Sequence, residues 1–580
     1  MAFDASSQEA ADKVADSQSP TWPEALRQAL ACATGGVDPA PTMAAFSNWA
    51  QQVCQHSERL GELGAALARG AAAIATAPSA RSHWAFQPDR DDKRFAGAGW
   101  EAPPFSALAQ TQLLLERLWR TGCAPLPGLA EQDRRRVEHL GLLSLGAMSP
   151  SNQPWTNPEV LAAAARSGGR TLLDGAALWL EDAGRLLDGK PLAGEDVLKV
   201  GKDLAATPGK VVFRNRLMEL IQYDPATPSV RPEPVLLVPA WIMKFYILDL
   251  TPETSLVRHL LEQGFSVFAI SWRNPSADDR ELALDDYRRE GVETAIALAR
   301  SICGAPVHAV GYCLGGTLLA IEAARRGRIG DPALASVSLL AAQTDFEEAG
   351  DYRKLLTQAD VAALEAAMQA HGVLQGWQMA LSFYGLRAND MLWPRIVNRY
   401  LKGEAAAAGP LETWLADTTR MPARMHAEYL RGCYLENRLA RGEMIVDGGQ
   451  IGLKDLRAPL FVLGAELDHI APWRSVQRLE LHASGERTFV LTGGGHNTSV
   501  VSPPGKPKAY YRIVTAAAGS PYMPPQAVES APRQEGSWWP AWTGWLADRS
   551  GPATRPPAKA RPLGCLAEVE AAPGRYVMER

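Results

Sequence analysis

The sequence predicts an α/β protein with a mostly parallel sheet, a mainly helical N-terminal domain and a helical insertion. Up to about residue 205, Ala, Leu, Arg and Glu dominate and strand-like runs are scarce; beyond residue 208, short β-branched runs alternate with helical stretches. Such alternation is typical of parallel strands joined by helices. Residues 342–459 contain no obvious strand, which predicts a helical cap inserted between two strands.

A chain of 580 residues is too long for one ordinary core, so we expect separate parts. The polar residues 1–21 are predicted to form a disordered tail, and the mainly helical N-terminal domain should follow over residues 22–205. We expect the α/β domain over residues 206–550, with its cap insertion at about 345–455. Residues 551–580, rich in Pro and Ala, are expected to form a loose C-terminal arm.

The individual elements follow from local patterns. FSALAQTQLLLERLW (105–119) and EVLAAAARSGGRTLLDGAALWLEDAGRLL (159–187) have a helical composition, and the second follows Thr-Asn-Pro, a helix start signal. Apolar β-branched runs predict strands at 235–239, 266–272, 307–312, 336–341, 460–464 and 488–492. Helices are expected between them at 254–263, 284–302 and 314–326.

Composition and residue spacing exclude several function classes. The net charge of -5 argues against wholesale nucleic-acid binding. Seven cysteines without a CxxC pair indicate a reducing, cytoplasmic compartment and no disulfide framework. The ten histidines lack metal-binding spacing, and neither GxGxxG nor a P-loop occurs, so no metal and no cofactor are expected. We also expect no secretion signal and no transmembrane segment, because the apolar runs are too short.

The stretch VHAVGYCLGGTLLA (307–320) indicates a strand, a sharp turn and a helix, with a thiol at the turn. Gly311 and Gly315 stand two residues before and after Cys313, as in the crowded nucleophile elbow of the α/β-hydrolase fold. The helix beginning at Leu314 would direct its dipole at the sulfur, and the Leu314 N–H would form half of an oxyanion hole. The alternative is a buried, inert cysteine in a glycine-rich turn.

The residue order predicts partners for this thiol, because the fold arranges its triad as nucleophile, acid and histidine. Asp468 follows the strand-like PLFVLGA, and His496 follows RTFVLT and a glycine turn. Both would lie at carboxyl ends of strands, where open α/β sheets bind ligands. His469 is a rival base, although adjacent residues in an extended loop tend to point apart, which favours a structural or orienting role. His308, inside a strand, is interpreted as a core histidine.

Beyond this spacing, the chain resembles the polyhydroxyalkanoate (poly-3-hydroxybutyrate) synthases of bacteria. The resemblance covers roughly residues 80–580 and is specific, because most of the matching stretches have no general meaning for the fold. It is carried by DKRFAGAGWEAPPF (92–105), TNPEVL (156–161), GKDLAATPGKVVFRNRLMELIQY (201–223), PAWIMKFYILDL (239–250), SLVRHLLEQGFSVFAISWRNP (255–275), GYCLGGTLLA (311–320), TRMPARMHAEYLRGCYLENRL (419–439), DHIAPW (468–473) and GSWWPAWTGWL (536–546).

The resemblance implies an acyltransferase at the surface of cytoplasmic polyester granules. It would polymerise 3-hydroxyacyl-coenzyme A with release of coenzyme A, which is then part of the substrate rather than a cofactor. The family's nucleophile corresponds to Cys313, its acid and histidine correspond to Asp468 and His496, and a second oxyanion donor would be the Ile242 N–H. Asp249 matches a family position near the site and joins His469 as an accessory candidate. The resemblance also implies a homodimer.

Two other functions stay open from the sequence. PAWIMK (239–244) and GHN (495–497) depart from the usual family motifs, which favours a divergent thioesterase or polyester hydrolase as one alternative. A non-catalytic granule-binding protein is the other. Near the end of the α/β domain, a helical stripe comprises Trp538, Trp539, Trp542 and Trp545. We interpret this stripe as core packing rather than as contact with polymer.

Overall fold

A twelve-stranded sheet forms the centre of the computed structural model, which describes residues 39–580 except 90–91, 189, 377, 380–387, 406–407 and 558–561. The tail predicted over residues 1–21 lies outside the described residues. The strand order is β14-β13-β12-β11-β6-β5-β3-β4-β2-β1-β15, with β16 also paired to β1. Its parallel centre consists of β4 (Val267–Trp272), β3 (Val235–Val238), β5 (Val307–Tyr312), β6 (Leu334–Leu340), β11 (Leu460–Ala465) and β12 (Arg487–Thr492).

These six parallel strands confirm the six predicted from apolar runs, and the fold class is the predicted one. The antiparallel outer strands were not predicted: β1 (Gly209–Arg214), β2 (Met218–Tyr223), β13 (Tyr510–Ala516) and β14 (Gln534–Glu535). The C-terminal arm also differs from the loose segment that was expected. Its described part contributes β15 (Leu563–Gly564) and β16 (Glu570–Ala571), which pair with β1.

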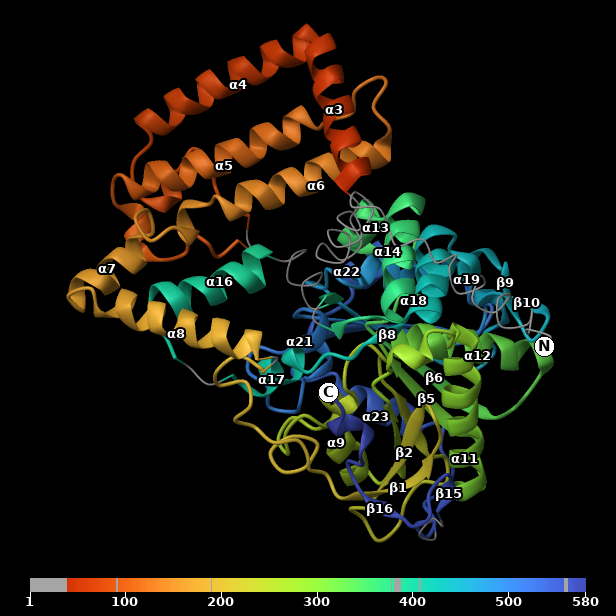
Figure 1. Ribbon diagram of the computed structural model, residues 1–580. Helices are drawn as coiled ribbons and strands as arrows, with labels where there is room; N and C mark the ends of the chain where they lie inside the picture. Colours follow the sequence, from red (N-terminus) through yellow and green to blue (C-terminus); the bar gives the residue numbers. More distant parts are fainter. Residues whose placement is uncertain are drawn as a thin grey trace, which may run out of the picture.

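Helices cover both flanks of the sheet (Figure 1). One flank carries α11 (Thr294–Cys303) and α12 (Leu314–Ile329), and the other carries α9 (Leu256–Glu262) and α23 (Trp539–Ala547). The tryptophan stripe lies mainly within α23, where Trp538, Trp539 and Trp542 are at most 1% exposed. Packing on the core is therefore confirmed for this stripe.

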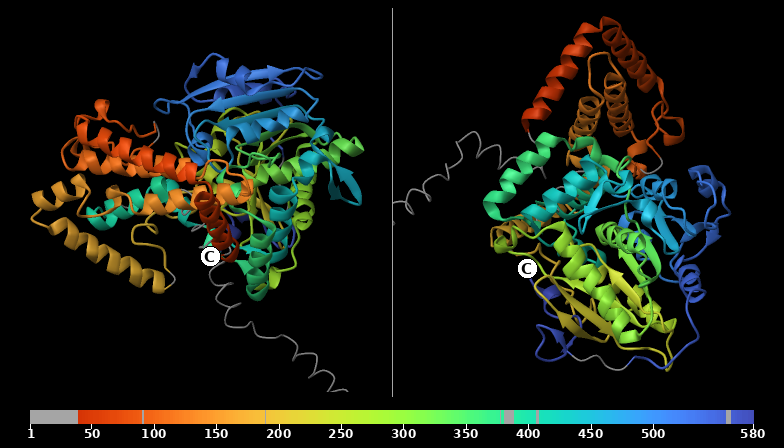
Figure 2. Two further views of the ribbon diagram at one scale, coloured as in Figure 1. Left: turned by 90° about the horizontal axis from the view of Figure 1, so that it is seen from above. Right: turned by 90° about the vertical axis from the view of Figure 1, so that its right-hand side faces the viewer.

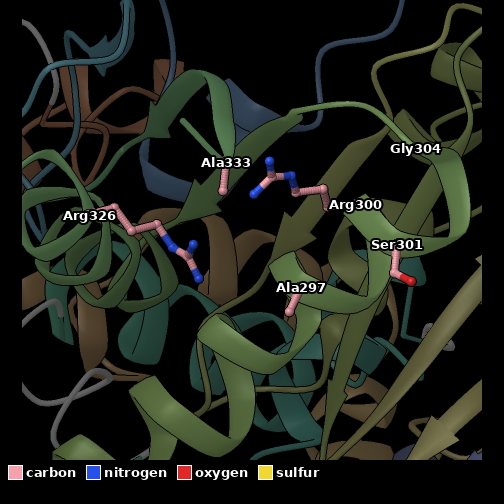
Figure 3. A pocket seen from close by; sticks show the side chains of 6 residues that line it. All are labelled: Ala297, Arg300, Ser301, Gly304, Arg326 and Ala333. Atoms are coloured by element: carbon pink, nitrogen blue, oxygen red, sulfur yellow. The ribbon is translucent and has the colours of Figure 1, made fainter. Parts of the chain in front are cut away.

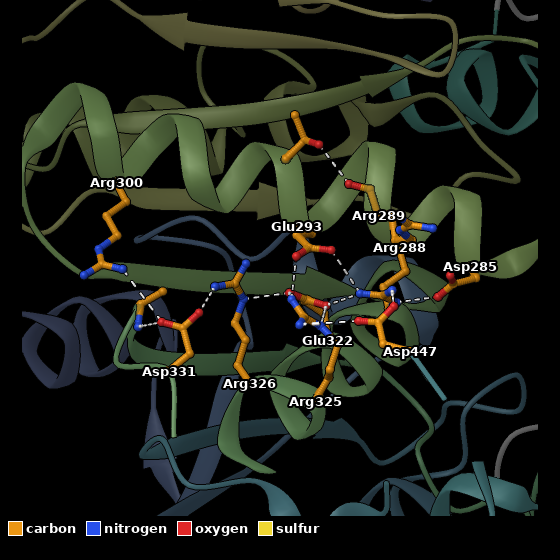
Figure 4. A network of polar contacts seen from close by, with 12 residues as sticks. Asp285, Arg288, Arg289, Glu293, Arg300, Glu322, Arg325, Arg326, Asp331 and Asp447 are labelled. Atoms are coloured by element: carbon orange, nitrogen blue, oxygen red, sulfur yellow. Dashed lines mark hydrogen bonds and ion pairs between the residues drawn. The ribbon is translucent and has the colours of Figure 1, made fainter. Parts of the chain in front are cut away.

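A buried ion cluster fixes α12, the helix that follows the nucleophile turn (Figure 4). The guanidinium of Arg288, on the π-helical turn η6 (Tyr287–Glu293), lies 2.8 Å from Glu322 of α12, and both side chains are fully buried. Arg288 also pairs with Asp285, Glu293 and Asp447. The cluster thus joins α12 to the segment before α11 and to the hairpin of β9 (Met444–Val446) and β10 (Gly449–Ile451).

The N-terminal helices stand to one side of the sheet domain (Figure 2). They are α3 (Pro39–Gln55), α4 (Ser57–Thr76), α5 (Phe105–Gly122), α6 (Glu131–Ala147), α7 (Pro158–Arg166) and α8 (Arg170–Leu187). Two buried ion pairs, Arg136–Asp360 and Arg399–Asp182, tie this domain to the insertion between β6 and β11. None of the described helices is both long and apolar enough to span a membrane.

The insertion between β6 and β11 is mainly helical. It contains two short strands, β7 (Val373–Leu374) and β8 (Met421–Pro422), besides the β9–β10 hairpin. Its helices are α13 (Gly350–Leu355), α14 (Gln358–His371), α16 (Trp393–Ile396), α17 (Pro410–Ala416), α18 (Ala423–Tyr429) and α19 (Arg438–Arg441), joined by π-helical turns η7 (Ala388–Leu392), η8 (Val397–Leu401) and η9 (Leu430–Leu435). After β11 come α20 (Trp473–Gln477), α21 (His496–Val500) and α22 (Pro525–Ser530).

Candidate active site

Cys313 occupies a strained turn between β5 and α12. Its φ of 53° lies in the left-handed region, which side chains other than glycine rarely adopt, and its ψ is -127°. Strain of this kind costs about 1–3 kcal/mol and is concentrated at functional sites. The Cys313 N–H donates to the carbonyl of Leu340 at 3.0 Å, which holds the turn against the end of β6. The turn therefore presents the thiol at the carboxyl edge of the sheet.

Glycines beside the turn are required by close backbone approach. A Cβ at Gly311 would lie 2.3 Å from the Cα of Gly316, and a Cβ at Gly315 would lie 2.2 Å from the carbonyl oxygen of Val238. Neither side chain could be accommodated without moving backbone atoms. The same crowding brings the loop after β3 against the first turn of α12.

Asp468 and His496 come together as the strand order predicts. The Nδ1–H of His496 donates to Oδ2 of Asp468 at 2.7 Å, and both side chains are buried. The other carboxylate oxygen, Oδ1, accepts the backbone N–H groups of Ile470 at 2.9 Å and Ala471 at 2.8 Å. Three donors thus hold the carboxylate in place, and the carboxylate in turn holds the Nδ1 edge of the imidazole.

The same imidazole is close to the thiol. Burial of the ring would favour its neutral form, but the charges of the Asp468 carboxylate and the Cys313 side chain, together with the hydrogen bond to Asp468, raise the pKa of His496 well above its ordinary value. Nε2 is buried and has no hydrogen-bond partner of normal geometry among the described residues. The hydrogen bond between a catalytic base and its nucleophile often forms with normal geometry only when substrate binds. Cys313, His496 and Asp468 can therefore act as a nucleophile, a base and an orienting acid.

The thiol environment differs from that of the structural cysteines in the chain. Burial raises the pKa of Cys433 and of Cys123 to about 12, so those thiols stay protonated and inert. Cys313 is only partly buried and lies at a helix N-terminus beside an imidazole. Its surroundings suit a reactive thiol rather than an inert one.

The two backbone positions expected to bind an oxyanion belong to segments that approach each other, because the backbone at the end of β3 lies against the first turn of α12 at Gly315. Leu314 is the first residue of α12, and Ile242 is buried in the loop that follows β3. This loop is braced from the cap, because the Ile242 carbonyl accepts the N–H of Thr419 at 3.2 Å and the Trp241 carbonyl accepts its hydroxyl at 2.6 Å. It is also braced from the sheet, where Trp272 Nε1 donates to the Pro239 carbonyl at 2.9 Å.

The accessory candidates occupy different surroundings. Asp249 is buried, and its carboxylate accepts the hydroxyls of Ser255, at 2.6 Å, and Thr207. Burial raises the pKa of Asp249 despite these bonds. Its contacts tie the loop before β1 to the segment after β3. His469 is exposed, and its carbonyl lies against Gly350. The buried hydrogen bond of Asp468 goes to His496, so His469 is not part of the buried acid–histidine pair.

Sequence reasoning assigned no role to two tyrosines of the cap that lie close to the thiol. Tyr429 and Tyr434 are buried, and burial raises the pKa of each, with a contribution from the negative charge that Cys313 can carry. The ring of Tyr429 packs edge-on against Trp241 at 5.9 Å. Both tyrosines belong to the quoted stretch 419–439, but a single sequence does not reveal which of its aromatic residues face the site.

A surface hollow lies away from Cys313, and Figure 3 shows the side chains that line it. Its volume is about 380 Å³, and it is lined by Ala297, Arg300, Ser301, Gly304, Arg326 and Ala333. Gly304 and Ala333 precede β5 and β6, whereas Cys313 follows the other end of β5. This hollow is therefore separate from the candidate site. Within the described ranges, no group of three or more His, Cys, Asp or Glu side chains could hold a metal ion.

Comparison with known proteins shows which families the sequence of this chain is similar to. Residues 91–260 match the family described as Poly-beta-hydroxybutyrate polymerase (PhaC) N-terminus, and residues 233–503 match the alpha/beta hydrolase fold. The chain is 40% identical over 539 residues to a poly(3-hydroxyalkanoate) polymerase of Methylorubrum extorquens, covering 91% of this chain and 87% of that protein. It is 39% identical to the poly(3-hydroxyalkanoate) polymerase subunit PhaC of Rhizobium etli, over 85% of this chain and 78% of that protein. The corresponding subunit of Cupriavidus necator is 36% identical, over 84% of this chain and 83% of that protein.

Proposed function

The chain belongs to the poly(3-hydroxyalkanoate) polymerases, which are acyltransferases, and from this premise we propose that it polymerises 3-hydroxyacyl-coenzyme A through an acyl-cysteine on Cys313. The observation that supports this mechanism is the buried hydrogen bond between His496 and Asp468, with the imidazole beside the elbow thiol. No cofactor is needed, because coenzyme A arrives as part of the substrate.

In the first half-reaction, Cys313 attacks the carbonyl carbon of the thioester. His496 accepts the thiol proton, and the tetrahedral oxyanion is held by the N–H groups of Leu314 and Ile242. Collapse of the intermediate breaks the carbon–sulfur bond to coenzyme A. His496 returns the proton to the departing sulfur, so the products are free coenzyme A and acyl-Cys313.

In the second half-reaction, the 3-hydroxyl of another unit attacks acyl-Cys313. His496, oriented by Asp468, removes the hydroxyl proton and then protonates the cysteine sulfur as the new ester forms. Each cycle extends the polyester by one unit and regenerates the thiol. The apolar cap residues over the site would keep out water, which would otherwise hydrolyse the acyl-enzyme.

A thiol suits this chemistry better than a hydroxyl. Attack by Cys313 exchanges one thioester for another, so the acyl group stays reactive enough for a secondary alcohol. Serine would give an oxygen ester close in energy to the polymer bond. A cysteine with a reference pKa of about 8.5 also reaches the thiolate state more readily than serine could reach an alkoxide.

The test is incubation of purified protein with short- and medium-chain 3-hydroxyacyl-coenzyme A, following free coenzyme A and the mass of the product. Polymer plus coenzyme A supports the proposal, whereas free hydroxy acid plus coenzyme A would support a thioesterase. Cys313→Ala should abolish coenzyme A release and the acyl adduct on the Cys313 peptide. Unchanged release by Cys313→Ala would overturn the mechanism, and absence of release from the unaltered protein would favour a non-catalytic role.

We further propose that the protein acts as a homodimer at the surface of cytoplasmic polyester granules. Family membership supports both parts, and an apolar outward face on α8 supports the granule contact. On this face Leu173, Leu180 and Leu187 are 73%, 65% and 90% exposed. Replacing all three by Ser should reduce sedimentation with polyester particles without changing the mass in solution. Light scattering that gives the mass of one chain would rule out the dimer.

A further inference from the structure

The short helix that begins with His496 is held by side chains from two later segments. The carbonyls of Ser499 and Val500 accept the indole N–H groups of Trp538, at 2.8 Å, and Trp539, at 3.0 Å. Both indoles are fully buried, with exposed fractions of 0% and 1%. Two tryptophans of the aromatic stripe therefore bond directly to the helix that carries the histidine.

The neighbouring carbonyls are bound as well. Lys506 Nζ donates to the carbonyls of Thr498 at 2.5 Å and Val501 at 2.8 Å, and the hydroxyl of Ser537 donates to the carbonyl of Ser502. Every carbonyl from residue 498 to 502 thus receives a side-chain donor. We call the four donors, Lys506, Ser537, Trp538 and Trp539, the carbonyl cradle.

A five-residue helix needs such support. α21 is too short to be stable by its own hydrogen bonds, so its position must come from tertiary contacts. Asp468 holds one ring nitrogen of His496, but that bond alone leaves the backbone beneath the ring free to shift. The ring must meet both Asp468 and Cys313, and a displacement of about 1 Å at a reacting group can cost about 100-fold in rate.

We propose that the carbonyl cradle, and Trp538 and Trp539 in particular, positions His496 for proton exchange with Cys313. These are positioning residues that act through the backbone of α21. The inference rests on the proposed function, because it assigns a purpose to the placement of the base. It gives the buried tryptophan pair a role in turnover beyond packing of the core.

The stripe itself supplies matched controls. Trp542 is equally buried, but its indole N–H donates to the hydroxyl of Ser338 on β6 at 3.0 Å rather than to a carbonyl of α21. Trp545 is 8% exposed, and its indole nitrogen is buried without a hydrogen-bond partner among the described residues. Trp→Phe at all four positions removes the same group and a similar volume, and only Trp538 and Trp539 lose a bond to the histidine helix.

The experiment compares Trp538→Phe/Trp539→Phe with Trp542→Phe/Trp545→Phe in the full chain. Two quantities are measured: kcat and KM for coenzyme A release, and the pH dependence of iodoacetamide alkylation at the Cys313 peptide by mass spectrometry. The first pair should lower kcat by about 10- to 100-fold, with KM changed less than about threefold. It should also shift the pH profile of alkylation, whereas the second pair should leave both unchanged.

Lys506 provides a rescue test. Lys506→Met should lower kcat, and Lys506→Arg, which keeps donors at the same place, should restore most of it. Equal kcat and equal alkylation profiles in the two tryptophan pairs, at equal folded fraction by thermal unfolding, would overturn the inference. The alkylation profile needs no turnover, so it still decides the inference if Cys313→Ala shows that the proposed function is wrong.

Discussion

The Nδ1–H of His496 donates to Oδ2 of Asp468 across 2.7 Å, although 28 residues separate them in the chain. The contact joins the loop after β11 to the start of α21, which follows β12, and β11 and β12 are neighbouring parallel strands. Since parallel strands place their carboxyl ends at one edge, the register of β11 and β12 brings acid and base together.

Asp468→Asn tests this contact. The amide keeps the shape of the side chain but removes the charge that raises the pKa of His496, and it favours the wrong ring tautomer. We expect kcat for coenzyme A release to fall by about 10²- to 10⁴-fold, by analogy with hydrolase triads. Initial rates at saturating substrate measure it, and a variant that keeps more than a tenth of wild-type kcat would contradict the assigned role.

The adjacent histidines can be separated by substitution. His496→Gln should reduce turnover as strongly as Asp468→Asn, because it removes the proton acceptor beside Cys313. His469→Gln should stay within about threefold of the wild type, since His469 is exposed and outside the buried pair. If the two variants exchanged these outcomes, His469 would be the base.

Glu322→Gln should destabilise the protein through the ion cluster beneath α12. Removing one partner of a buried ion pair costs about 3–5 kcal/mol when the remaining charge is uncompensated. Arg288 keeps three other acidic partners, so we expect a loss of about 2 kcal/mol in the free energy of unfolding. Urea unfolding measures it. Asp285→Asn, whose side chain is 46% exposed, is the control and should cost less than about 1 kcal/mol.

His426 should make stability depend on pH below neutrality. Burial lowers its pKa from 6.5 to about 4, and both ring nitrogens lack hydrogen-bond partners among the described residues. As the pH falls below 6.5, the unfolded chain binds a proton that the folded chain refuses, so stability falls until about pH 4. Over this range His426 should lower the free energy of unfolding by about 3 kcal/mol.

His426→Leu should remove that dependence. The substitution keeps an apolar shape and leaves no unpaired ring nitrogen, so stability at pH 7 should be equal or higher. Thermal unfolding midpoints at pH 7 and pH 5 compare the two proteins. A wild-type midpoint no more sensitive to acid than that of His426→Leu would show that another group governs this range.

A double-mutant cycle tests the contact between the loop after β3, which contains Lys244, and the C-terminal segment. Lys244 is 3% exposed, and its ammonium donates to the carbonyls of Tyr576 at 3.1 Å and Glu579 at 2.7 Å. Removal of residues 576–580 should destabilise the chain and slow turnover, because a buried charge loses its acceptors. In the shortened chain, Lys244→Met should recover about 1–3 kcal/mol of stability. Additive effects of the two changes would contradict direct coupling.

The sequence predicted the parallel strands because their apolar runs are uninterrupted and both faces are buried. Among the outer strands, β2 was not predicted because it carries a charged side chain on its buried face. Glu219 of β2 is fully buried beside Arg214 of β1 and accepts the N–H groups of Arg575 and Tyr576. A strand that buries a carboxylate lacks the alternation of apolar and polar residues by which a strand is predicted from sequence.

The candidate triad could be predicted because each member follows a recognisable strand in the expected order. The supports of the triad could not be predicted in the same way. Trp538 meets Ser499 across 39 residues, and Lys244 meets Glu579 across 335. These pairs have no local pattern, since they arise only when the sheet has brought distant segments together.

Both outer edges of the sheet end in very short strands. β14 has two residues, Gln534 and Glu535, both exposed, and the free side of β1 is covered by β15 and β16, also of two residues each. A long bare edge would be a template for strand addition by another chain and hence for aggregation. Very short edge strands limit such strand addition, so many copies should crowd together with little self-association through the sheet.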